Sequence, residues 1–214
     1  MAMRRAILLT VSALLLVVAA GLRWPAPMAS GRTPGAVRNA SSLIAHFPNV
    51  RLRTQENREV RFYDDLIKGK VVLLNFMFTS CTTLCPRSTE NLVKVQQALG
   101  DHAGRDVFMV SISVDPQTDT PAVLKEYGER FHTKPGWTFV TGNAADIDLL
   151  QRQLGVFDND EGKAQHTGML IYGSETTGSW TATPIMLSAP SVARNVLRLV
   201  GPTPSSAKSG DSGS

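Results

Sequence analysis

Cys81 and Cys85 are the only cysteines of the 214-residue chain, and both lie in the segment Cys81-Thr82-Thr83-Leu84-Cys85-Pro86. Two thiols this close together can share a soft metal ion or exchange electrons as a dithiol/disulfide pair. A plain structural disulfide is a third interpretation, but a bridge that closes so small a loop adds little stability. Redox pairs usually have the spacing Cys-x-x-Cys, and the additional residue here leaves room between the two sulfurs for a metal ion.

Two thiolates are an incomplete site for most metals, so a third ligand is expected, and histidine is the first residue type to consider. The four histidines of the chain are His46, His102, His132 and His166. The first three lie in an entry segment, a turn and a helix end, where surface or capping roles are usual. His166 differs because it precedes the segment 167–172, which we expect to form a strand. A loop that leads into a sheet strand can reach the edge that displays the cysteines, although a solvated loop histidine is the alternative.

The elements around the cysteines are predicted by hydrophobic patterns. The apolar run Val71-Val72-Leu73-Leu74-Asn75-Phe76-Met77-Phe78 predicts a strand that is buried on both faces. The following residues, Pro86 to Leu99, have apolar side chains at helical spacing, and Gly100 is the stop signal. We therefore expect a helix that begins near Pro86, with both cysteines between the strand and the helix. The positive end of a helix favours a thiolate over a thiol at such a place.

Apolar runs alternate with amphipathic stretches along the rest of the chain, which is the pattern of an α/β fold. We expect further strands at 60–63, 106–114, 137–140, 167–172 and 180–187, and further helices at 121–131, 144–154 and 191–200. This order predicts a thioredoxin-like fold, with a central mixed β-sheet flanked by helices.

Composition divides the chain into four parts. Residues 1–23 begin with basic side chains and continue as an uncharged apolar stretch, which predicts an uncleaved membrane anchor or a cleaved signal peptide. Residues 24–42 are rich in Pro, Gly, Ser and Ala and are predicted to be a flexible linker. Residues 43–200 are predicted to be the globular domain, and residues 201–214 a disordered tail. The domain is expected to face the oxidising periplasm, either anchored at the inner membrane or secreted into the periplasm.

The net charge of the chain makes nucleic acid an improbable partner. The formal charge is +4, but three of the 22 basic residues lie within 1–23, which leaves 19 basic against 18 acidic residues. The part expected to fold is therefore nearly neutral, and it lacks the basic excess that phosphate backbones require.

Three motifs in order resemble the Sco/SenC family. They are the segment Phe78 to Pro86 around the cysteines, the segment Ser111 to Pro121, and the downstream His166, with Trp137 to Gly142 between the last two. The resemblance implies a thioredoxin-like fold on a membrane anchor. It also implies that Cys81, Cys85 and His166 bind one copper ion, which the protein delivers to cytochrome c oxidase.

The donor set agrees with this implication, because two thiolates and an imidazole suit three-coordinate Cu(I) and the nitrogen also permits Cu(II). Zinc would require a fourth ligand or water. The chain departs from the family pattern at Gln165, where an Asp usually precedes the histidine, and in the turn 173–178. Asp115 is expected either to border the site and steer a partner or to serve as a turn residue before Pro116.

Two functions from different classes remain open. The first is a copper metallochaperone, not an enzyme, whose client is a cytochrome c oxidase subunit or another exported cuproprotein. The second is a thiol:disulfide oxidoreductase in which Cys81 and Cys85 form the redox pair that acts on cysteines of an exported client. A thiol peroxidase is a weaker third hypothesis, because no set of peroxide-activating residues is evident.

Overall fold

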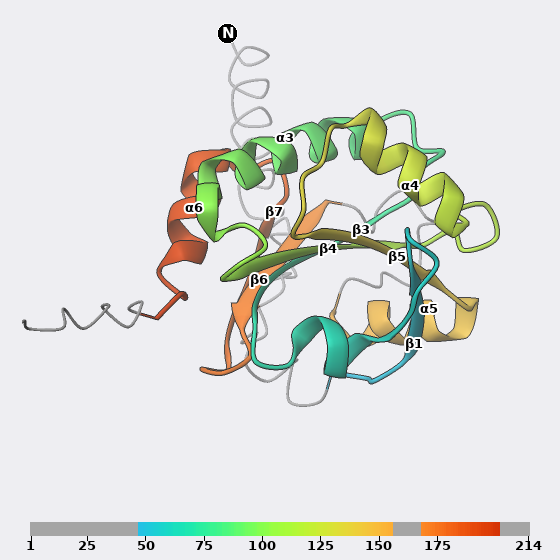
Figure 1. Ribbon diagram of the computed structural model, residues 1–214, viewed down its shortest axis with the longest axis horizontal. Coiled ribbons are helices and arrows are strands. Elements are labelled where there is room, and N and C mark those ends of the chain that lie inside the picture. Colours follow the sequence, from blue (N-terminus) through green and yellow to red (C-terminus); the bar gives the residue numbers. More distant parts are fainter. Residues whose placement is uncertain (1–46, 156–167, 202–214) are drawn as a thin grey trace, which may run out of the picture. The chain divides into compact units, whose positions relative to one another are not determined.

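The structure, a computed structural model, describes residues 47–155 and 168–201, which form a mixed sheet with helices on both faces (Figure 1). The strands are β1 (Arg51–Thr54), β2 (Glu59–Arg61), β3 (Val71–Met77), β4 (Val107–Ser113), β5 (Trp137–Gly142), β6 (Met169–Ser174) and β7 (Ser179–Pro184). The helices are α3 (Leu84–Leu99), α4 (Pro121–Arg130), α5 (Ala144–Gln153) and α6 (Ala189–Leu197), with a π-helical turn η1 (Phe62–Ile67) and a 3-10 turn η2 (Gly100–His102). Within the described residues the strand order is β2-β1-β5-β4-β3-β6-β7.

Strand β3 lies inside the sheet, between β4 and β6, and all seven of its residues are buried. It runs parallel to β4, from the pair Val71 and Val107 to the pair Met77 and Ser113, and antiparallel to β6. An uninterrupted apolar run is stable as a strand only where both faces are covered, which is the case here. The prediction of a doubly buried strand before the cysteines is therefore confirmed.

The two faces of the sheet carry separate hydrophobic cores. One core joins the sheet to α3, α4 and α6, and includes Leu92, Leu124 and Val192, each at most 1% exposed. The other joins it to η1 and α5, and includes Phe62 and Ile147. Figure 1 shows α3, α4 and α6 on one side of the sheet and α5 on the other. The helices of the first core hold the cysteine segment in place, because α3 begins within it, at Leu84.

The topology joins a β3-α3-β4 unit with parallel strands to a β6-β7-α6 unit that begins with an antiparallel hairpin. The resulting local order β4-β3-β6-β7 is that of a thioredoxin-like fold, and the predicted fold class is confirmed. Because β6 is antiparallel to β3, the end of β3 and the beginning of β6 meet at one edge of the sheet. Asn75 is paired with Leu170 there.

Several predicted boundaries differ from the structure, among them the strand 180–187, which ends at Pro184, and the helix 191–200, which spans Ala189–Leu197. Helix α3 begins at Leu84 rather than near Pro86, so Cys85 lies inside the helix and only Cys81 lies in the preceding loop. The third helical residue can be proline, because the N–H groups of a first turn have no partner within the helix. The predicted strand 60–63 ends at Arg61, where η1 takes over, and β1 was not predicted because only two of its four residues are buried.

Residues 1–23, 24–42 and 201–214 of the predicted division lie wholly or almost wholly outside the described residues, as does His166. The domain limits and the anchor or signal segment therefore stay predictions. Among the helices of residues 47–155 and 168–201, none has the length and hydropathy that crossing a membrane requires.

Candidate functional site

The two cysteines lie at the beginning of α3. Cys81 is partly exposed in the loop after β3, whereas Cys85, the second residue of α3, is only 1% exposed. The Cys85 backbone N–H donates a hydrogen bond to the Cys81 Sγ at 3.4 Å, and the Thr83 Oγ1 lies 3.7 Å from the same sulfur. Neither cysteine forms a disulfide in this structure. The segment thus presents two thiols at a helix N-terminus, where negative charge on sulfur is stabilised.

The pKa of Cys81 is lowered from 9.0 to about 7. Partial burial by itself raises this pKa, but hydrogen bonds from the backbone and side chains of Cys85 and Thr83 together outweigh it. A thiol with such a pKa is largely a thiolate at slightly alkaline pH, and the thiolate is the form that binds metals and attacks disulfides.

We expect the alkylation of Cys81 by iodoacetamide in the metal-free chain to increase with pH around a midpoint near 7. Cys85 should react far more slowly at every pH because its side chain is buried. Peptide mass spectrometry after short exposures between pH 5 and 9 measures both reactions. A midpoint close to the ordinary thiol value of about 8.5 would contradict the hydrogen-bonding account.

The aspartate most closely connected to the cysteine loop is Asp119, which the sequence did not single out as a site residue. Its side chain is fully buried and accepts hydrogen bonds from Thr79, two residues before Cys81, and from Ser113 at the end of β4. The available signal was its position within the segment Ser111 to Pro121, directly before the helix cap Thr120.

Asp115 takes the turn role that was one of its two expected roles. Its backbone N–H donates to the Ser113 Oγ at 3.0 Å, and its carbonyl accepts hydrogen bonds from the backbone N–H groups of Thr118 and Asp119 at 3.0 and 2.8 Å. These bonds fold the connection between β4 and α4, and they bring Asp119 toward the cysteine loop.

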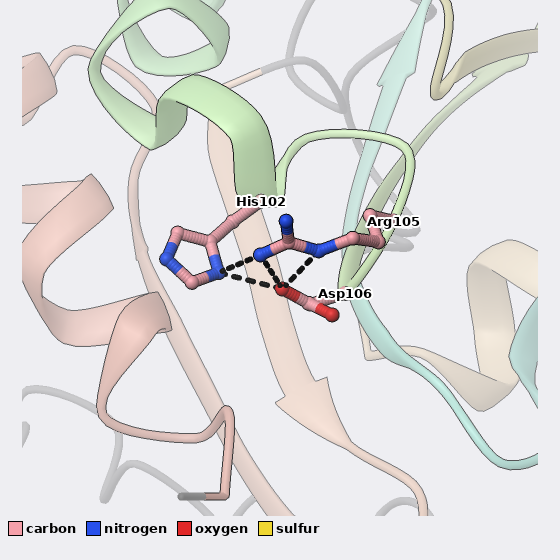
Figure 2. Close-up of polar contacts among 3 residues, drawn as sticks. All are labelled: His102, Arg105 and Asp106. Atoms are coloured by element: carbon pink, nitrogen blue, oxygen red, sulfur yellow. Dashed lines mark hydrogen bonds and ion pairs between the residues drawn. The ribbon is translucent and has the colours of Figure 1, made fainter. Parts of the chain in front are cut away.

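The two described histidines have structural roles, as expected. Figure 2 shows the His102 ring beside Asp106, with the His102 Nδ1 2.6 Å from the Asp106 Oδ2. The Arg105 guanidinium donates to the same carboxylate at 2.8 Å, and the bonds from Arg105 and then His102 lower the pKa of Asp106. His132 follows α4 with a φ of 55°, a left-handed conformation that ends the helix.

The chain re-enters the described structure close to the cysteines, two residues after His166. A methyl group placed on Gly168 would lie 4.0 Å from the Cδ2 of Leu84, the residue that precedes Cys85. The pairing of β6 with β3 leads to the same place, because Leu170 is opposite Asn75 near the end of β3. Within residues 47–155 and 168–201, no three His, Cys, Asp or Glu residues are grouped closely enough to hold a metal ion. The position of His166 as third ligand stays a prediction.

Comparison with known sequences assigns most of the domain to one family. The SCO1/SenC family model matches residues 41–181, which is more than half of the chain. A SCO2-like protein of Rickettsia felis is 38% identical over 102 residues, or 48% of each chain. The mitochondrial SCO2 homolog of Bos taurus is 33% identical over 147 residues, which cover 65% of this chain and 50% of that protein. The chain therefore spans about half the length of these relatives.

Solved structures agree with the sequence matches. Bradyrhizobium japonicum ScoI with copper bound has a TM-score of 0.58 and 26% identity, and the match covers 70% of this chain and 96% of that one. Yeast Sco1 with copper bound has a TM-score of 0.58 at 21% identity, over 72% of this chain and 88% of that one, which shows the shared fold. By its sequence and its fold, the chain belongs to the SCO1/SenC family.

Proposed function

We propose that the chain binds one copper ion through Cys81, Cys85 and His166 and delivers it to an exported cuproprotein. The observation that carries the proposal is the pair of thiols at the start of α3, with the pKa of Cys81 lowered to about 7. Copper-bound ScoI, which matches 70% of this chain, supports the choice of metal. Two soft thiolates and one imidazole form a donor set that accommodates Cu(I) and permits Cu(II).

Because copper is delivered to another protein in this proposal, the site must both bind the ion and release it. Cys81 supplies a partly exposed thiolate that a client's ligand can approach, and Cys85 supplies a second sulfur fixed by the first turn of α3. His166, at the beginning of the path into β6, supplies the nitrogen. The proposed client is a subunit of cytochrome c oxidase or a related cuproprotein, as the resemblance to the family implies.

The proposed location is the periplasmic face of the inner membrane. The support is the sequence of residues 1–23, in which basic residues precede an uncharged apolar stretch. In the oxidising periplasm the two cysteines would form a disulfide unless they were kept reduced or bound to a metal. A cysteine pair that binds copper or exchanges electrons is therefore compatible with this location.

Titration of the reduced full chain with copper tests the proposal. We expect one equivalent to bind tightly, and we expect both Cys81→Ser and Cys85→Ser to lose this binding, because each removes a thiolate ligand. Thr82→Ala is the matched control, since Thr82 is an exposed residue between the two cysteines. Copper binding by either serine variant with the affinity of the unchanged chain would refute the two-thiolate site.

A second candidate function is supported by the unequal exposure of the two thiols. A partly exposed thiolate ahead of a buried thiol is the arrangement of a disulfide reductase. Cys81 would attack one sulfur of a client disulfide and release the other as a thiolate. Cys85 would then attack Cys81, which frees the reduced client and leaves a Cys81–Cys85 disulfide. Multiple turnovers on a client disulfide, supplied with an external thiol reductant, would support this function.

A further inference from the structure

Asp119 is a fully buried acidic residue for which copper ligation gives no reason. Its carboxyl group accepts from the Thr79 backbone N–H at 3.1 and 3.3 Å, from the Thr79 hydroxyl at 2.5 Å and from the Ser113 hydroxyl at 2.5 Å. Burying an acidic group is costly unless hydrogen bonds compensate it. A side chain that is 0% exposed, with both oxygens occupied, therefore indicates that this position needs an acceptor for several donors at once.

The donors on one side belong to the loop that carries Cys81. Thr79 is bound through both its N–H and its hydroxyl, which fixes the direction in which the chain leaves β3. The Cys81 N–H then donates to the Phe78 carbonyl at 3.3 Å and closes a turn around Thr79. The Cys81 sulfur, at the end of this turn, meets the Cys85 N–H at 3.4 Å. A continuous series of hydrogen bonds and one tight turn thus joins Asp119 to the sulfur.

On its other side, Asp119 is bonded to the end of strand β4. Ser113 is the last residue of β4, and the next residue, Val114, donates its N–H to the Met77 carbonyl at 2.9 Å. The Asp119 N–H donates in turn to the Asp115 carbonyl at 2.8 Å. These bonds fix the carboxyl group relative to β3 and β4 independently of its bonds to the cysteine loop.

We propose that Asp119 is a positioning residue for the Cys81–Cys85 pair, which it holds in a metal-ready geometry by tying Thr79 to the end of β4. The part of this inference that concerns copper rests on the proposed function. Groups that orient metal ligands typically change metal affinity about 10- to 100-fold when they are replaced. A purely structural role predicts a loss of stability without a specific change at the sulfurs.

A second buried network in the same sheet provides the matched control. The Ser111 hydroxyl donates to the Asn75 Oδ1 at 2.7 Å and accepts from the Trp137 Nε1–H at 2.9 Å. Ser111 is 1% exposed and lies two residues before Ser113 on β4, but none of these bonds reaches the cysteine loop. Ser111→Ala should therefore lower the melting temperature and leave the cysteine pair unchanged.

The test compares Asp119→Asn, Thr79→Val, Thr79→Ser and Ser111→Ala in the full chain. We expect Asp119→Asn and Thr79→Val to lower Cu(II) affinity about 10- to 100-fold and to shift the sulfur-to-copper charge-transfer band. Thr79→Ser keeps the hydroxyl and should restore both. In the metal-free chain, we expect the first two variants to lower the equilibrium constant for Cys81–Cys85 disulfide formation with oxidised glutathione about tenfold.

Two results would overturn the inference. The first is wild-type affinity, band position and glutathione equilibrium in both Asp119→Asn and Thr79→Val. The second is an equal change of all three in Ser111→Ala, which would mean that the effect follows stability. If Asp119→Asn does not fold, the nearly isosteric Thr79→Val and its rescue by Thr79→Ser decide the matter. If the unchanged chain binds no copper, the proposed function fails, and the glutathione equilibrium still tests the role of Asp119.

Discussion

Replacing His166 with alanine is expected to abolish stable Cu(II) binding, with a loss of affinity of at least about 100-fold. Even residues that only orient a ligand cost about 10- to 100-fold, and His166 is proposed as the ligand itself. The histidine supplies the nitrogen donor that Cu(II) prefers over an all-thiolate site. Cu(II) titration followed by absorbance and electron paramagnetic resonance measures the loss.

The same substitution should leave the thiol chemistry of the cysteines within about twofold of the unchanged chain, because neither sulfur is altered. His102→Ala is the matched control. His102 lies beyond the C-terminal end of α3, whereas Cys85 lies in its first turn, and the 16-residue helix is about 24 Å long. His102 is also bound to Asp106. Unchanged copper affinity and spectra in His166→Ala would show that the three-ligand site is wrong, whatever the cysteines do.

Gly136→Ala is expected to lower the stability of the fold strongly. Gly136 has a φ of +91°, and a Cβ there would lie 2.3 Å from the Gly104 Cα and 2.4 Å from the Gly104 N. Both atoms belong to backbone, so the turns before β4 and β5 would have to separate. The left-handed conformation and the overlap together should lower the free energy of unfolding by about 3–5 kcal/mol. Urea denaturation followed by tryptophan fluorescence measures the change.

Gly69→Ala separates the two causes. Gly69 has a φ of +71°, but nothing lies within 4 Å of a Cβ placed there. This variant should lose only about 1–2 kcal/mol, the cost of a left-handed alanine. If Gly136→Ala were no less stable than Gly69→Ala, the turns at Gly104 and Gly136 could separate at little cost in free energy, which would contradict the prediction.

The sequence was sufficient for the central elements and for the cysteine edge of the sheet. The apolar run from Val71 forms the predicted strand covered on both faces, and Gly100 ends α3 as expected. The start of α3 was misplaced because Pro86 resembles a first helical residue, although it is equally compatible with the third. Strand β1 carries exposed arginines at Arg51 and Arg53, and it acquires its identity only from pairing with β2 and β5.

The two thiols of the candidate site could be predicted from the sequence, but the buried aspartate that holds the cysteine loop could not. Cys81 and Cys85 are conspicuous because they are the only cysteines. The role of Asp119 depends on a contact across 40 residues, which no local pattern reports. Its neighbour Thr120 is the N-cap of α4, so an acidic residue beside it is readily taken for part of the helix start.

If the chain transfers copper as proposed, the burial of Cys85 sets the order in which the two sulfur ligands are exchanged. A ligand from another protein can reach the partly exposed sulfur of Cys81, whereas Cys85, in the first turn of α3, is 1% exposed. Of the two sulfur bonds, the one to Cys81 would therefore be exchanged first, while Cys85 and the proposed ligand His166 still hold the ion. The sulfur bond to break last would be the one to Cys85, which the recipient cannot approach directly. Release from Cys85 would then depend on how strongly the recipient holds an ion that it already shares.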